Sequence, residues 1–123
     1  MASRKVLQMT MWLIFVALLP AAGQQSIEDK VIDKIKQLPE VKERAKYVKV
    51  HSNNERHLQY TIFQQPTEQH KYYWVKVLED NGEMYHTQFN FYVNAKTLAI
   101  KYFDPQLDTV IDYKVWKKMR KSD

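Results

Sequence analysis

The sequence predicts an α+β fold in which N-terminal helices pack on one face of a four-stranded antiparallel meander, with a short helix at the C-terminal end. Two observations predict this fold. Before His51, apolar residues recur every three or four positions, which is the period of an amphipathic helix. From Leu58 onward, apolar and polar residues alternate, which is the period of a strand with one buried face. Because each element must bury its apolar side, helices are expected to cover one face of the sheet.

The first residues have the three parts of a secretory signal peptide. Arg4 and Lys5 precede an apolar run, Met11–Leu19, and the small residues of Pro20–Gly23 follow it. The apolar stretch is shorter than the roughly 20 residues that a membrane-spanning helix needs. We therefore expect residues 1–23 to be a cleaved signal peptide, with no stable membrane span after cleavage.

Cleavage between Gly23 and Gln24 leaves residues 24–123 as a single α+β domain. It takes Arg4 and Lys5 from the 19 basic residues and none from the 14 acidic ones, which leaves a net charge of +3. So small a charge argues against a nucleic-acid partner. The chain has no cysteine, a pattern that suits a secreted or periplasmic protein of a bacterial cell envelope better than a disulfide-stapled eukaryotic one.

Two helices are expected before the sheet. Ser26 and Asp29 resemble a capping box, and an apolar stripe follows them: Ile27, Val31, Ile35 and Leu38. Pro39 suits the first turn of a second helix, whose stripe is Val41, Ala45 and Val48. The polar run from His51 to Glu55 is expected to turn the chain toward the sheet.

Four strands are expected to follow in sequence. The first holds Leu58, Tyr60 and Ile62. The next two are the arms of a hairpin, Tyr72–Glu79 and Met84–Val93, with Asn81 and Gly82 at its tip. The fourth holds Leu98, Ile100 and Tyr102 and stops at Asp104-Pro105. A further short strand at Val110 and Ile111 is an open alternative. A last helix, capped by Asp112, is expected to carry Val115, Trp116 and Met119.

The face of the sheet opposite the helices is the candidate binding surface. Alternation assigns Tyr85, Phe89, Phe91 and Val93 to the core. The opposite face is then formed by a set of polar and aromatic side chains: Tyr72, Trp74, Lys76, His86, Gln88, Asn90 and Tyr92. Such a mixture suits contact with a peptide or sugar. The alternatives are an ordinary solvated face, or a face that the C-terminal helix covers through Trp116.

Patterns of catalytic or metal chemistry are missing from the sequence. The four histidines, His51, His57, His70 and His86, are dispersed and do not have metal-ligand spacing. Asp104, Asp108 and Asp112 recur every four residues, but turns and caps explain them better than calcium does. With two glycines in the chain, no phosphate-binding loop is expected. We expect no metal and no cofactor, and catalysis is disfavoured.

A helix followed by a meander, with YYWVKVLEDNG (Tyr72 to Gly82) leading to FNFYVNAKTLAIKYFD (Phe89 to Asp104), resembles the cystatin-like folds and most of all the small exported PepSY-like domains. The resemblance covers Ile27 to Asp104. It implies a binding or inhibitory role, since domains of that kind are associated with restraining peptidases. The chain has no inhibitory loop of the Gln-Val-Val-Ala-Gly type, so no site residue is carried over.

The sequence therefore favours a small exported module that binds a protein or peptide in the cell envelope, with enzyme inhibition as the sharpest form of that role. Two other classes remain open. One is a small enzyme with a pocket between helix and sheet, using acid-base chemistry around His57 or His86. The other is a structural subunit that pairs through a sheet edge.

Overall fold

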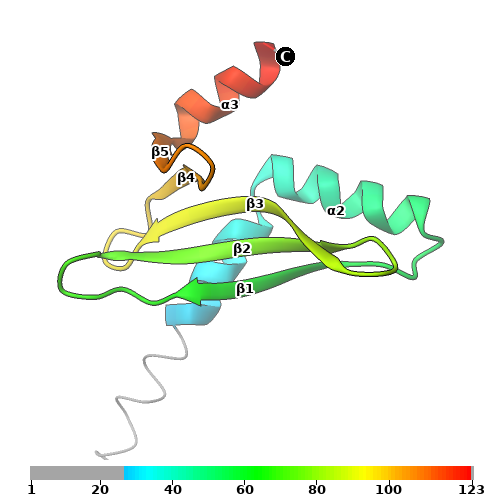
Figure 1. Cartoon of the computed structure of the whole chain (residues 1–123), viewed down its shortest axis with the longest axis horizontal. Helices are drawn as coiled ribbons and strands as arrows, with labels where there is room; N and C mark the ends of the chain where they lie inside the picture. The colour runs from blue at the N-terminus through cyan, green and yellow to red at the C-terminus, as the bar shows by residue number, and fades with distance from the viewer. Residues whose placement is uncertain (1–26, 123) are drawn as a thin grey trace, which may run out of the picture. The chain divides into compact units, whose positions relative to one another are not determined.

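The computed structural model describes residues 27–122 of the chain (Figure 1). The chain divides into two compact units, Met1–Lys30 and Val31–Asp123. In the first unit, residues 27–30 are helical. The expected signal peptide, residues 1–23, and the expected cap at Ser26 lie outside the described residues.

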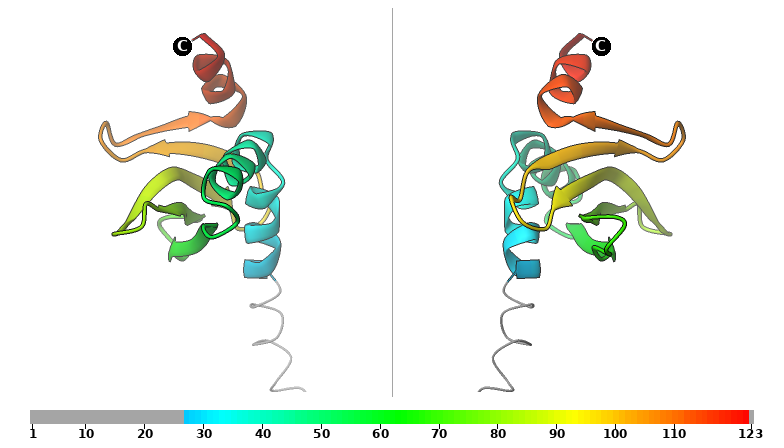
Figure 2. Two further views of the ribbon diagram at one scale, coloured as in Figure 1. Left: turned by 90° about the vertical axis from the view of Figure 1, so that its right-hand side faces the viewer. Right: turned by 90° about the vertical axis from the view of Figure 1, so that its left-hand side faces the viewer.

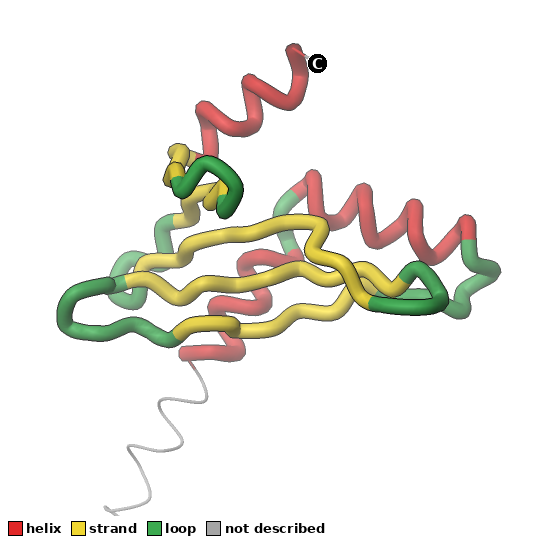
Figure 3. The backbone as a smooth tube through the Cα atoms, in the orientation of Figure 1, coloured by secondary structure: helices red, strands yellow, loops and turns green. Residues whose placement is uncertain are grey.

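The second unit is an α+β fold, as the sequence predicts, with a single open antiparallel sheet (Figure 3). Residues 31–36 are helical and precede helix α2. Five strands lie side by side in chain order, and each pairs antiparallel with the next. The elements are α2 (Pro39–His51), β1 (Leu58–Gln64), β2 (Tyr72–Asp80), β3 (Tyr85–Asn94), β4 (Ile100–Asp104), β5 (Thr109–Asp112) and α3 (Tyr113–Ser122).

The predicted number of four strands is wrong, because β5 pairs with β4 as a fifth. Pro105 ends β4, but the chain reverses instead of leaving the sheet. The Asp104 carboxylate accepts hydrogen bonds from the backbone N–H groups of Gln106 and Leu107, and Asp108 adopts a left-handed conformation with φ 49°. This turn returns Val110 and its neighbours to the edge of β4.

Proline and asparagine set the ends of α2. Pro39 is at the first helical turn, after Leu38 in an extended conformation, as the sequence predicts. At the other end, Ser52 donates its hydroxyl to the Val48 carbonyl. Asn53 and Asn54 then take left-handed conformations, with φ 54° and 64°, which asparagine tolerates better than most residues. The helix stops there, and the chain turns toward β1.

The β2–β3 hairpin has the predicted tip. Gly82 has φ +99°, a conformation that side chains with a Cβ rarely adopt. The Asp80 carboxylate accepts a hydrogen bond from the Gly82 N–H, and the Asn81 side chain accepts from Glu83 and Met84. Short polar side chains therefore satisfy the turn, which is the reason such residues mark a hairpin.

One face of the sheet is buried by helices (Figure 2). Its core joins apolar residues of helical residues 31–36, of α2 and of the central strands: Val31, Ile35, Val41, Val48, Tyr73, Val75, Val77, Phe89, Phe91 and Val93. Trp116 of α3 belongs to the same core. Its ring stacks on Tyr102 at 4.6 Å and meets Phe91 edge-on at 5.6 Å. The alternative in which the C-terminal helix covers the opposite face is therefore wrong.

A β-bulge reverses the faces in the first half of β3. Val77 pairs with Phe89 and Leu78 pairs with Thr87, so Gln88 is an extra residue. Beyond the bulge, Glu79 pairs with His86 on the helix face, and Asp80 pairs with Tyr85 on the other. The predictions that Tyr85 is core and that His86 shares a face with Tyr92 are wrong, since strict alternation cannot reveal an inserted residue.

Candidate functional site

The candidate site is the sheet face opposite the helices, here called the open face. The strand register brings five of the seven predicted residues together on it: Tyr72, Trp74, Lys76, Asn90 and Tyr92. Trp74 lies opposite Tyr92, and Lys76 lies opposite Asn90. Gln88 is in the bulge, and His86 faces α2, so these two do not belong to the surface.

A continuous set of aromatic rings occupies the open face. We call it the aromatic cluster; its members are Phe63, His70, Tyr72, Trp74, Tyr92 and Phe103. Trp74 is central, with ring centroids 4.6 Å from Phe63 and 5.0 Å from Phe103 in edge-to-face geometry. Phe103 stacks on Tyr92 at 4.6 Å. Such pairs stabilise by about 0.5–1.5 kcal/mol beyond the area that they bury.

The rings bury one another although no described helix of the second unit covers them. Tyr92 is 9% exposed and Phe103 is 6% exposed. Phe63, at the β1 end of the cluster, is 56% exposed. The aromatic cluster thus forms a small, closely packed apolar platform. Its most exposed ring, Phe63, lies in the edge strand β1.

Polar groups orient the platform. The Trp74 indole N–H donates to the Asn90 side-chain oxygen at 2.9 Å, and Asn90 is itself buried. Burial, aided by the nearby Asp108 carboxylate, raises the pKa of Tyr92. The His70 Nδ1 atom is buried with no hydrogen-bond partner in the described part of the chain.

Two lysines lie over the rings. Lys76 Nζ is 3.8 Å from the Phe63 ring centroid and 5.1 Å from that of Trp74. Lys101 Nζ is 5.7 Å from the Tyr72 centroid and 3.9 Å from the Asp112 carboxylate. No ion pair joins Lys76 to a carboxylate of residues 27–122. Its charge is therefore available to an anionic group that approaches Phe63.

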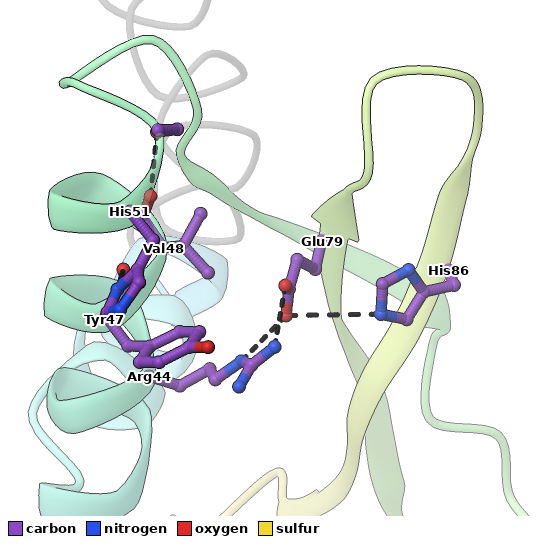
Figure 4. A network of polar contacts seen from close by, with 7 residues as sticks. Arg44, Tyr47, Val48, His51, Glu79 and His86 are labelled. Atoms are coloured by element: carbon purple, nitrogen blue, oxygen red, sulfur yellow. Dashed lines mark hydrogen bonds and ion pairs between the residues drawn. The ribbon is translucent and has the colours of Figure 1, made fainter.

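His86 belongs to a polar cluster on the helix face (Figure 4). Arg44 of α2 donates two hydrogen bonds, of 2.8 and 2.7 Å, to the Glu79 carboxylate, and His86 Nε2 is 4.0 Å from the same group. The hydrogen bonds that Arg44 donates to Glu79 raise the pKa of Arg44, although burial opposes the shift. A carboxylate engaged by a guanidinium in this way is a poor general base. The cluster ties α2 to the hairpin.

His57 lines a pocket of about 430 Å³ between α2 and β1. The other lining residues are Ala45, Lys46, Lys49, Leu58 and Tyr60. This pocket contains a histidine but is lined by no carboxylate, so it lacks the pair that acid-base catalysis around His57 would use. Nowhere within residues 27–122 do three potential metal-ligating side chains gather. Among those same residues, no helix has the length and apolar character needed to cross a membrane.

Four members of the open face are not among the predicted site residues: Phe63, His70, Lys101 and Phe103. Phe103 and Lys101 follow from the alternation of β4, in which Ile100 and Tyr102 face the core, so the signal was present. Phe63 also follows from alternation, since Leu58, Tyr60 and Ile62 face the core and Phe63 is on the other side of the strand, next to a register shift before Gln64. His70 lies between β1 and β2, where no strand period predicts the face that a side chain joins.

Comparison of the chain with protein-family models, with curated proteins and with solved structures found no match. The resemblance to cystatin-like and PepSY-like domains therefore stays a prediction. The function has to be argued from the open face itself.

Proposed function

We propose that this protein is an exported binding module that holds a protein or peptide of the bacterial cell envelope on the open face of its sheet. Inhibition of an envelope enzyme is the sharpest form of this role. The observation that carries the proposal is the aromatic cluster, a fixed platform on a face that no described helix of the second unit covers.

The chemistry of the platform favours a peptide with apolar and acidic side chains. Aromatic rings supply a large contact area, and their mutual packing means that little conformational entropy is lost on binding. Phe63 and Lys76 are the accessible pair, because Phe63 is 56% exposed and Lys76 lies over its ring. A bound peptide could place a carboxylate beside Lys76 and an apolar side chain on Phe63, and would then contact both accessible residues.

Export is supported by the sequence pattern of residues 1–23, which have a basic start, an apolar run and a small-residue end. The absence of cysteine fits a domain that rests on its core rather than on disulfides. The described core joins helical residues 31–36, α2, α3 and the central strands, which supports a domain that folds without disulfides.

The test is selection from a displayed random peptide library by the immobilised protein. The test variant is F63A/K76A, which changes the two accessible groups. The matched control is Y47A/K42A on α2, where Tyr47 is 49% exposed and lies in cation–π contact with Arg44. Circular dichroism and thermal melting verify that both variants fold.

We expect the wild type and the Y47A/K42A control to enrich the same peptides, and F63A/K76A to lose that enrichment. In a Trp116→Phe background, where Trp74 is the one tryptophan of residues 27–122, quenching or shift of its fluorescence by a selected peptide would locate the contact, since the ring centroids of Trp74 and Phe63 are 4.6 Å apart. Equal enrichment by all three proteins, or none by the wild type, would overturn the proposal.

A further inference from the structure

The edge strand β1 presents an unprotected backbone. It is the first strand of the sheet, and no described strand pairs with its outer side (Figure 1). Its sequence, LQYTIFQ, carries no charge, and Gln59, Thr61 and Phe63 are exposed. The other edge, β5, is shorter and ends in Asp112. Proteins usually protect an edge with charges or proline, and β1 has neither within its length.

The bulge limits how much of β1 can pair. Register is regular from Leu58 to Ile62 and shifts before Gln64, and Pro66 follows. Alternate residues of this regular part point their backbone N–H and C=O groups away from β2, because the two sides of a strand alternate. An added strand would therefore pair over about five residues.

Side chains of an added strand would reach two different surfaces. On the helix side lies the pocket of about 430 Å³ between α2 and β1, where Lys46, Lys49 and His57 surround Ala45 and Tyr60. No acidic residue lines that pocket. Lys36 Nζ adds a further positive charge, 5.1 Å from the Tyr60 ring centroid.

On the other side of β1 lies the accessible end of the aromatic cluster. Phe63 is exposed there, and Lys76 Nζ is 3.8 Å from its ring centroid. Both surfaces that flank β1 thus combine apolar contact area with lysine. No carboxylate lines the pocket, and the charged group over the Phe63 ring is Lys76. The edge between them is uncharged.

We infer that an extended acidic peptide adds to β1 as a sixth strand. The inference rests on the proposed function, and it specifies how the ligand binds, by strand addition, and what the ligand is, an acidic peptide. The peptide backbone pairs with Leu58–Ile62, and its alternate side chains enter the basic pocket and contact Phe63. Main-chain hydrogen bonds supply affinity, and the two lysine-bearing surfaces supply selectivity for carboxylates.

Charge complementarity favours such a peptide over a second copy of the chain. The β1 strand of another copy is LQYTIFQ, which has no carboxylate to offer Lys46 or Lys49. Two copies joined through β1 would bring two sets of pocket lysines to one junction without neutralising them. An acidic peptide neutralises them.

The probe is a synthetic peptide of about seven residues in which glutamate alternates with valine, with both ends blocked. A lysine-valine peptide of the same length is the charge control. Two further versions carry N-methyl groups, on every glutamate or on every valine. Because N–H groups of a strand alternate in direction, only one of these two versions blocks pairing with β1. Binding is measured by fluorescence anisotropy of the labelled peptide.

We expect the glutamate-valine peptide to bind, the lysine-valine peptide not to bind, and one N-methylated version to lose about tenfold or more in affinity while the other does not. Hydrogen exchange slows in the complex at those amides of Leu58–Ile62 that point away from β2. Lys49→Glu weakens binding by about tenfold, whereas Lys121→Glu, at an exposed position of α3 that does not line the pocket, changes it little.

Other outcomes separate this inference from the proposed function. If library-selected peptides need Phe63 and Lys76 but tolerate both patterns of N-methylation, edge addition is overturned and the open-face proposal stands. If no library peptide binds, both fall. Concentration-dependent self-association that protects the β1 amides, with no binding of the acidic peptide, overturns the inference in favour of a second copy.

Discussion

Tyr113 should make folding stability depend on alkaline pH. Its hydroxyl donates a hydrogen bond of 2.6 Å to the Glu40 carboxylate, which joins α3 to α2. Glu40 has an 11% exposed side chain and a second partner, Lys117, at 4.0 Å. Burial, and then the hydrogen bond and negative charge of Glu40, raise the pKa of Tyr113 to about 12. In the unfolded chain the same phenol titrates near 10.

The sign follows from proton linkage. Between pH 10 and pH 12 the unfolded state has lost the Tyr113 proton and the folded state keeps it, so stability falls as the pH rises. The difference in pKa corresponds to at most about 2.7 kcal/mol, at about 1.36 kcal/mol for each pH unit. Because Tyr113 is partly exposed and solvent screens its interaction with Glu40, we expect about half of that.

The perturbation is Tyr113→Phe, compared with the wild type by urea denaturation from pH 8 to pH 11.5. Below pH 10 we expect the variant to be about 1.5 kcal/mol less stable, the value of a hydrogen bond to a charged group. Above pH 10 the gap should shrink toward zero. The raised pKa values of Tyr60, Tyr92 and Tyr102 affect both proteins alike and cancel in the comparison. A gap that stays constant across the whole range would refute the reasoning.

Three further predictions concern folding and processing. Trp116→Ala should lower the free energy of unfolding by about 3–5 kcal/mol in urea denaturation, since it removes the ring that holds α3 on the core. Val115 is 49% exposed, so Val115→Ala should change the free energy of unfolding by less than about 0.5 kcal/mol. Equal effects of the two substitutions would contradict this packing. Gly82→Ala should cost about 1–2 kcal/mol in the same assay, because its φ of +99° is unfavourable for a residue with a Cβ, and an unchanged stability would mean that the turn adopts another conformation. Mass spectrometry of the protein recovered after expression in a bacterial host should give a chain that begins at Gln24, and an intact N-terminus would remove the signal peptide from the proposal.

Much of the fold could be predicted from local patterns. Pro39 marks the start of α2, because its φ is fixed near the helical value and the first turn needs no backbone N–H. Gly82 marks the hairpin, because its positive φ is one that few other residues adopt. The alternation of Tyr73, Val75 and Val77 identifies the core face of β2, since side chains of a strand point to opposite faces in turn. Each of these signals depends on neighbours in the chain.

The candidate site was predictable only in part. Trp74 and Tyr92 share the predicted face because strict alternation holds in both strands on the far side of the bulge from the hairpin tip. The prediction for His86 is wrong because the bulge at Gln88 inserts one residue. Phe63, in contrast, continues the alternation of Gln59 and Thr61, so its face was predictable. A bulge forms when packing across strands favours it, and no spacing in one strand reports that.

By itself, the sequence determined the class of the fold, the positions of the turns and the absence of disulfides, since backbone preference, hydrophobic period and composition are local properties of the chain. Only the tertiary structure decided which face α3 covers, that β5 joins the sheet, and that Phe63, Trp74 and Phe103 meet in one aromatic cluster. These outcomes depend on register and on contacts between residues far apart in the chain, where the free energy of packing chooses among arrangements that the local pattern leaves equal.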